Sequence, residues 1–172
     1  MWTKMKIITN TSPIIGLYDV FSMDGLKLLT SLYSDISTSN YVYDKEMLYP
    51  EELVHFKKKF IIKRTPSKSA LERLLEEFKG NIQLGEITCA ALYLDGGYEE
   101  LLMEDEKAER AFLDKGIVVR NVLELSYLAI RNDVLDEKEA RIFVAGMTRE
   151  FRPSQRIVEK FKVEGFGFLL EP

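Results

Sequence analysis

The chain has few of the residues that support thiol or imidazole chemistry. It contains one cysteine, Cys89, and one histidine, His55, among 172 residues. A single cysteine forms no intrachain disulfide, which favours a reducing, cytoplasmic setting. His55 has no second histidine to pair with, so a surface position is favoured over a catalytic one. Cys89 stands beside Ala90 and Ala91 in a helical pattern, which favours a small buried residue over a nucleophile.

The chain also lacks long hydrophobic runs and a strong charge of one sign. No apolar run is long enough to span a bilayer, and we expect neither a membrane helix nor a secretory signal. The net charge of −4 gives no overall attraction to nucleic acid, so an RNA partner would need a local basic patch. With 46% hydrophobic residues, we expect a single globular domain over residues 1–172.

Short apolar strands alternate with amphipathic helices along the chain. The predicted strands cover residues 5–9, 35–38, 60–63, 101–103 and 117–119. The predicted helices cover residues 13–20, 24–33, 40–48, 68–79, 83–95, 105–115 and 121–131. One further helix starts near Asp136, and a last one covers residues 154–163. This order predicts an α/β fold with a central parallel sheet covered by helices on both faces.

Polar side chains follow two of the predicted strands. Strand 5–9 ends in Thr9 and is followed by Asn10, Thr11 and Ser12. Strand 101–103 is followed by three acidic residues. Those are Glu104, Asp105 and Glu106. In an open parallel sheet, ligands bind outside the carboxyl ends of the strands. Clustered carboxylates in such a place suit a hard cation such as Mg²⁺ or Mn²⁺.

Each candidate also has a purely structural interpretation. Ser12 before Pro13 is a typical helix N-cap, and Asp105 can cap the helix that follows it. Glu86, at the edge of the apolar stripe of helix 83–95, is either half-sheltered beside a crevice or an exposed first-turn acid. We expect Asp105 rather than Glu104 to face inward, because Asp105 is in phase with Ala108 and Phe112.

A basic stretch lies in the first half of the chain. Its members are Lys57, Lys58, Lys59, Lys63, Arg64 and Lys68. Such a stretch could follow a phosphate backbone. Without interleaved aromatic residues, a solvated surface is the favoured interpretation.

Four segments, in order, resemble PIN-domain proteins, most of all the small prokaryotic ones with an Asp-Thr-Ser-Pro turn. "IITNTSPIIGLYDV" resembles their opening strand and helix, and "LGEITCAALYL" resembles their Gly-Glu helix. "LLMEDEKAERAFLDKGIVV" resembles the strand, acidic pair and helix that follow. "NVLELSYLAIRNDVLDEKEA" resembles the next buried helix and turn. The resemblance covers residues 5–165 and implies a PIN-like three-layer α/β/α fold.

The resemblance also implies a Mg²⁺- or Mn²⁺-dependent ribonuclease, often the toxin of a toxin–antitoxin pair. Carried over by position, the metal ligands would be Asn10, Glu86, Glu104 and Asp105, and Ser12 would support the turn. The catalytic group would comprise Glu86, Asp105, Asn10 and Ser12. A fourth acid falls near Asp44, Lys45 or Glu46, and the best register places Lys45 there. This chain departs from the family at position 10, where asparagine replaces aspartate and removes one charge.

Three functions follow from these observations. The first is a ribonuclease acting on RNA with a partly degenerate acidic site, held silent by a small antitoxin protein and forming a homodimer. The second is a catalytically inactive PIN-like domain that binds nucleic acid or protein. The third is a structural partner that uses the apolar C-terminal segment "GFGFLL" as an interface.

Overall fold

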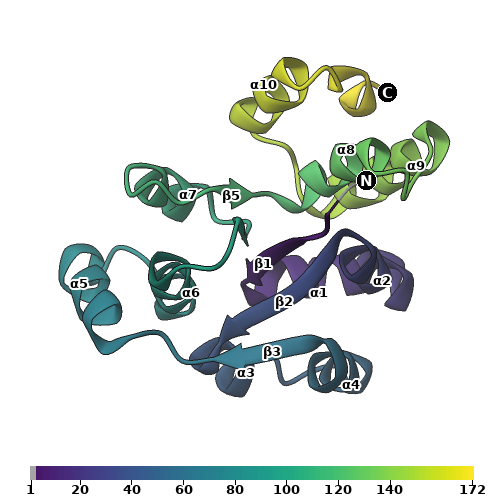
Figure 1. Ribbon diagram of the computed structural model, residues 1–172. Coiled ribbons are helices and arrows are strands. Elements are labelled where there is room, and N and C mark those ends of the chain that lie inside the picture. The colour runs from purple at the N-terminus through teal and green to yellow at the C-terminus, as the bar shows by residue number, and fades with distance from the viewer. Residues whose placement is uncertain (1–2) are drawn as a thin grey trace.

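The computed structural model describes residues 3–172, and within them the strands form one five-stranded parallel sheet (Figure 1). The strand order is β3-β2-β1-β4-β5. The strands are β1 (Met5–Thr9), β2 (Tyr33–Ser39), β3 (Ile61–Arg64), β4 (Glu100–Leu102) and β5 (Val119–Arg120). All four neighbouring pairs are parallel. This arrangement confirms the predicted α/β fold with a central parallel sheet.

Helices connect every strand to the next. The helices are α1 (Thr11–Phe21), α2 (Met23–Leu32), α3 (Asn40–Lys45), α4 (Glu51–Phe60), α5 (Lys68–Phe78), α6 (Leu84–Asp95), α7 (Glu106–Leu113), α8 (Leu125–Arg131), α9 (Glu137–Glu150) and α10 (Gln155–Val163). Two 3₁₀ turns, η1 (Val122–Glu124) and η2 (Gly167–Leu170), complete the described elements.

The helices form two layers around the sheet. Helix α6 packs on β1, β2 and β4. Helix α2 packs on β2 and also contacts α1 and α8, and α1 in turn contacts α9. Figure 1 shows α5, α6 and α7 on one side of the sheet and α1, α2, α8 and α9 on the other. Ile7 and Ile8 of β1 are both fully buried, as expected for a strand covered on both faces. The fold is therefore the three-layer α/β/α arrangement.

Helix α4 was not predicted from the sequence. Its buried residues Leu53 and Phe56 are three positions apart and lie on one face, while Lys58 and Lys59 are exposed. Two apolar residues in a segment rich in lysine give a weak periodic pattern, which by itself indicates a solvated basic stretch and not a helix.

The start of α1 corrects a second prediction. The helix begins at Thr11, so Ser12 lies inside its first turn and is not the N-cap. Asn10 occupies the N-cap position, but its side chain makes no capping hydrogen bond. The amide of Asn10 is therefore left available for another role.

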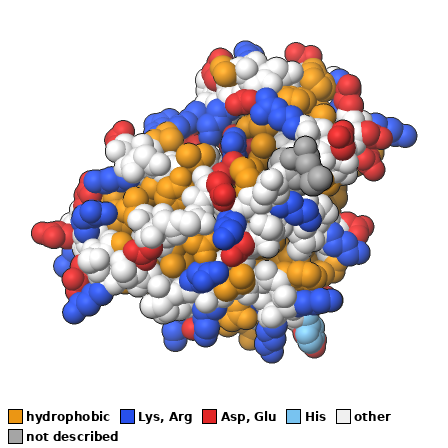
Figure 2. All heavy atoms as spheres, in the orientation of Figure 1, with side chains coloured by type: hydrophobic (Ala, Val, Ile, Leu, Met, Phe, Trp, Pro, Cys, Tyr) orange, Lys and Arg blue, Asp and Glu red, His pale blue; other side chains and the backbone are white. Residues whose placement is uncertain are grey.

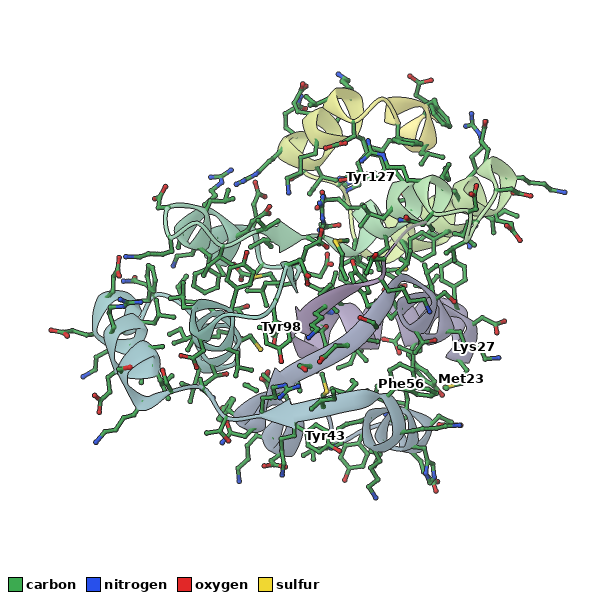
Figure 3. The ribbon with its side chains drawn as sticks, viewed as in Figure 1. Met23, Lys27, Tyr43, Phe56, Tyr98 and Tyr127 are labelled. Carbon is green, nitrogen blue, oxygen red and sulfur yellow. The ribbon has the colours of Figure 1, made fainter. Side chains whose placement is uncertain are left out.

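The apolar C-terminal segment packs against its own chain. Leu169 is buried, and the Phe166 ring stacks on Tyr127 with centroids 5.5 Å apart. Tyr127 lies between α8 and α10, as Figure 3 shows. This segment is used internally and does not offer the free interface that the sequence suggested. Within residues 3–172, no helix combines the length and the apolarity that crossing a membrane requires.

Candidate metal centre at the carboxyl ends of β1 and β4

The candidate site lies where the chain leaves β1 and β4, two adjacent strands at the centre of the sheet. Strand β1 leads into α1 on one face and β4 leads into α7 on the other, and ligands of such sheets bind where neighbouring connections diverge in this way. We refer to the group of Asn10, Glu46, Glu86 and Asp105 at this place as the crevice. The Asn10 backbone N–H donates to the Leu102 carbonyl at 3.0 Å, which continues the pairing of the two strands by one residue. Asn10 and the acids after β4 are thereby brought together.

Asp105 is the N-cap of α7, and one of its carboxylate oxygens accepts the Ala108 N–H at 2.7 Å. The capping interpretation is therefore correct. It does not remove Asp105 from the site, because its negative charge acts on Glu86 and raises the pKa of that carboxyl. A cap uses one oxygen and leaves the other for a second partner.

Glu86 lies in the first turn of α6 and is only 6% exposed, so the interpretation as an exposed acid is wrong. Its carboxylate accepts the Gln83 backbone N–H at 3.2 Å, which forms a capping box. Burial, followed by the charges of Asp105 and Glu46, raises the pKa of Glu86 to about 7, while the Gln83 N–H opposes the rise. At neutral pH this carboxyl exchanges a proton readily.

The third acid in the crevice is Glu46, whose charge acts on Glu86, whereas Lys45 is exposed. The Val42 carbonyl accepts from both the Glu46 N–H at 3.0 Å and the Met47 N–H at 3.1 Å. The last turn of α3 thus carries a regular helical bond from Glu46 and a wider bond from Met47. Of the three positions that the sequence left open, Glu46 is the one whose charge acts on Glu86.

Gly85 makes room for the Glu46 carboxylate. A Cβ atom added to Gly85 would overlap both oxygens of that carboxylate. Burial raises the pKa of Glu46, and the neighbouring Thr11 hydroxyl partly offsets that rise. Glu46 and Glu86 therefore approach from α3 and from the start of α6, respectively.

Three buried polar atoms in this crevice have no hydrogen-bond partner of standard geometry. They are Asn10 Oδ1, Thr11 Oγ1 and Glu46 Oε2. Buried polar atoms in folded proteins are almost always paired, and an exception calls for a water, an ion or a functional reason. Two of the three are oxygen acceptors of the kind that a divalent cation prefers.

The acidic side chains of the crevice do not surround a common point. Among residues 3–172, no three Asp, Glu, His or Cys side chains are grouped closely enough to hold a metal ion. The donor set is nevertheless compatible with a hard cation, because Asn10, Glu46, Glu86 and Asp105 offer only oxygen ligands. The amide of Asn10 replaces one carboxylate, so the set carries less negative charge than four acids would.

Glu104 and Ser12 are placed apart from this group. The Glu104 carboxylate accepts the Asn121 side-chain N–H at 2.8 Å and the Val122 backbone N–H at 2.6 Å, which fastens the start of η1. Burial and the charges of Glu124 and Glu109 raise the pKa of Glu104 to about 8, against the effect of the two donors. Ser12 is exposed and makes no side-chain hydrogen bond with any described residue.

Buried hydroxyl groups support the turn after β1 from the neighbouring strand and from α6. The Thr38 hydroxyl donates to the Thr9 carbonyl at 2.6 Å, and the Ser39 and Thr88 hydroxyls are 2.8 Å apart. Cys89 is also buried there, and burial raises the pKa of its thiol to about 11. This confirms that Cys89 is a buried residue and a poor nucleophile. The sequence offered no pattern that linked these positions.

The basic stretch does not form one continuous cationic surface. Lys57 is buried and donates to the Tyr43 carbonyl at 2.9 Å, and Figure 3 labels Tyr43. Lys63 pairs with Asp44 at 3.2 Å, and Arg64 pairs with Asp35 at 3.3 Å. Figure 2 shows basic and acidic side chains interspersed over the face that it draws. The exposed Lys63, Arg64 and Lys68 each pair with an acid, which leaves Lys58 and Lys59 as the exposed members without a salt bridge to a described acid.

Comparison with known proteins agrees with the fold. None of the curated proteins matches the chain. The family model described as DUF3368, PIN domain, matches residues 6–164, which includes every strand except the first residue of β1 and all four donors of the crevice. Because this match covers most of the chain, the protein belongs to the PIN domain family.

Proposed function

We propose that this protein is a metal-dependent ribonuclease that hydrolyses phosphodiester bonds in RNA, with Mg²⁺ or Mn²⁺ as its cofactor. The observation that carries the proposal is the pair of unpartnered buried oxygens, Asn10 Oδ1 and Glu46 Oε2, beside the carboxylates of Glu86 and Asp105. A fold without a ligand at this place would leave both oxygens unsatisfied.

The residues divide into ligands and a proton acceptor. Asn10, Glu46 and Asp105 would hold the ion through oxygen atoms. When bound, a divalent ion supplies positive charge to the phosphate and favours ionisation of water. Glu86, with a pKa of about 7, takes the proton of the attacking water as the new P–O bond forms. The P–O bond to the departing ribose oxygen breaks, and that oxygen takes a proton from solvent.

The test is a cleavage assay on labelled RNA with Mg²⁺ or Mn²⁺. It compares wild type, Asp105→Asn, Asn10→Asp and a control, Asp114→Asn. Asp114 is exposed at the other end of α7, so the control makes the same chemical change on the same helix outside the crevice. We expect Asp105→Asn to lose activity, on the order of 100-fold or more, and the control to retain it.

Asn10→Asp restores a fourth carboxylate and should strengthen metal binding. We expect it to cleave RNA at lower Mn²⁺ concentration than wild type does. Absence of cleavage by wild type together with cleavage by Asn10→Asp would show a dormant nuclease. Absence of cleavage by every variant would reject the proposal.

A second candidate function is a catalytically inactive domain that binds nucleic acid or protein. The neutral Asn10 and the lack of a preformed group of three acids within residues 3–172 favour it. RNA binding that does not change when Mn²⁺ is added or removed, without any cleavage, would support this function over the first.

The proposal extends to a biological role as the toxin of a toxin–antitoxin pair, active as a homodimer and silenced by a small partner protein. Bacterial expression provides the test. Wild type should arrest growth, and Asp105→Asn should not. Sedimentation of the purified protein at several concentrations tests the homodimer.

A further inference from the structure

Two buried hydroxyl groups link α3, whose C-cap is Glu46, to α6, which carries Glu86. Ser39 is the N-cap of α3, Thr88 lies in α6, and their hydroxyl oxygens are 2.8 Å apart. Ser39 is fully buried, and Thr88 is 3% exposed. Both hydroxyls therefore depend on partners within the chain.

The hydrogen bonds around these two hydroxyls run in one direction. The Thr88 hydroxyl donates to the Gly85 carbonyl at 2.9 Å, and a hydroxyl has one hydrogen to donate. The Ser39 hydroxyl is therefore the donor to Thr88, and it accepts the Val42 N–H at 3.1 Å. We call this series, from the Val42 N–H through Ser39 and Thr88 to the Gly85 carbonyl, the hydroxyl chain. It leads from the first turn of α3 to the first turn of α6.

Helix α3 has little apolar packing that would fix its orientation. It is six residues long, and Val42 is its buried residue. A helix this short depends on tertiary contacts, and one buried side chain does not set the rotation of a helix about its axis. The hydroxyl chain joins the start of α3 to α6, and the Glu46 carboxylate meets α6 at Gly85. Gly85 and Thr88 are three residues apart, so α3 touches one face of α6 at both of its ends.

We propose that Ser39 and Thr88 are positioning residues for the metal centre, because their hydroxyls hold α3 on α6 in the orientation that brings Glu46 to Glu86. The inference rests on the proposed function and deepens it, since it names residues outside the crevice that determine how tightly the ion binds. Loss of a group that orients metal ligands without touching the ion typically weakens metal binding about 10- to 100-fold. A purely structural role would lower stability but leave the metal affinity of the folded protein unchanged.

The first measurement is the affinity for Mn²⁺ without RNA, so that it does not depend on cleavage. Electron paramagnetic resonance of free Mn²⁺ gives this affinity, at a temperature where every variant is folded. Thr88→Val removes the hydroxyl and keeps the shape of the side chain, whereas Thr88→Ser keeps the hydroxyl. The control is Ser126→Ala. Ser126 is fully buried in α8 and donates to the Leu123 carbonyl at 2.7 Å, three residues back, as Thr88 does to Gly85.

We expect Thr88→Val to weaken Mn²⁺ binding about 10- to 100-fold, whereas Thr88→Ser and Ser126→Ala bind Mn²⁺ as wild type does. Ser39→Ala should weaken binding to a similar degree. The double variant that combines Ser39→Ala with Thr88→Val should bind no more weakly than the weaker single variant, because both substitutions break one hydroxyl chain.

Wild-type affinity for Mn²⁺ in Thr88→Val would overturn the inference. Equal weakening in Ser126→Ala would also overturn it, because the effect would then come from a general loosening of the fold. Equal weakening in Thr88→Ser would assign the effect to the packing of the methyl group. Should Thr88→Val not fold, Ser39→Ala is compared with Thr88→Ser and Ser126→Ala in the same way.

The second measurement needs no metal. Hydrogen exchange of the Val42 amide, followed by NMR with EDTA present, reports on the start of the hydroxyl chain. Exchange at Val42 should be faster in Thr88→Val than in wild type, on the order of tenfold, and unchanged in Ser126→Ala. Unchanged exchange in Thr88→Val would overturn the inference. Faster exchange at Val42, together with no Mn²⁺ binding by any of the proteins, would reject the metal-dependent function alone, since the hydroxyl chain would still hold α3 on α6.

Discussion

Two clusters of ionisable side chains in the molecule are built in opposite ways. In the buried ion network, defined here as Glu100, Arg120, Glu124, Tyr127 and Lys160, the central carboxylate Glu124 is fully buried and fully paired. Arg120 and the Tyr127 hydroxyl lie 3.1 Å and 2.6 Å from one of its oxygens. The Asn121 N–H and the Lys160 ammonium lie 2.8 Å and 3.3 Å from the other.

The crevice has no cation of its own. Glu86 is surrounded by the charges of Asp105 and Glu46, and its pKa is raised to about 7. Asn10 Oδ1 and Glu46 Oε2 have no partner. The ion network completes its hydrogen bonds from within the chain and joins α10 to the sheet, whereas the crevice leaves two buried oxygens without a hydrogen bond. Paired charges are typical of a structural role, and unpaired buried groups are what the proposed function would explain.

Breaking the ion network should have the largest effect on stability. Arg120→Met removes the cation between Glu100, at 2.8 Å, and Glu124. Leaving buried carboxylates without that partner should lower the free energy of unfolding by about 3–5 kcal/mol. Urea denaturation measures the change. Arg110→Met, which removes an exposed pair with Glu106, is the control and should cost at most about 1 kcal/mol. Equal losses of unfolding free energy in Arg120→Met and Arg110→Met would show that the buried network stabilises the fold no more than an exposed ion pair does.

Titration of Glu104 should make the free energy of unfolding depend on pH. Its pKa is about 8 in the folded chain and lower when exposed, so unfolding releases a proton between these values. Stability should therefore fall as pH rises from about 5 to about 8, with a slope of up to about 1.4 kcal/mol per pH unit from this group. Glu104→Gln should flatten this part of the stability profile. An unchanged slope would show that other groups cause it.

A methyl group at Gly85 should disturb the crevice without harming the fold. Gly85→Ala places a Cβ atom where the Glu46 carboxylate lies, so activity should fall about tenfold or more. The substitution is inside a helix, where alanine is otherwise favoured over glycine. The matched test compares melting temperatures of Gly85→Ala with and without Glu46→Ala, because no carboxylate meets the methyl group in the double variant. If the methyl group lowers the melting temperature equally in both, its effect does not act through Glu46.

Neutralising a crevice acid should have the smallest effect and the opposite sign to Arg120→Met. Glu86→Gln removes a charge crowded by two others but keeps an oxygen for the Gln83 N–H. Without metal, the variant should be about 1 kcal/mol more stable than wild type. The rise in melting temperature that Mn²⁺ gives wild type should shrink in the variant. Scanning calorimetry with and without Mn²⁺ measures both, and a destabilised variant would place Glu86 among structural charges.

Local patterns predicted much of the fold because hydrophobic periodicity and capping chemistry act over a few residues. The first strand has the predicted bounds, Met5–Thr9, and helix α9 starts at the predicted place, where Asp136 and Glu139 form a capping box. Asp105 at the end of a strand was identified in the same way. Helix α4 was missed because its two buried anchors are outnumbered by charged neighbours.

The sequence by itself determined the order of strands and helices and which polar residues stand at the ends of β1 and β4. Only the tertiary structure decided which acids share the crevice. Glu46, not the exposed Lys45, acts on Glu86, and Glu104 accepts two N–H groups at the start of η1. Glu86 is buried, and α3 packs against the helix that carries it. These outcomes depend on contacts between segments far apart in the chain, which no local pattern records.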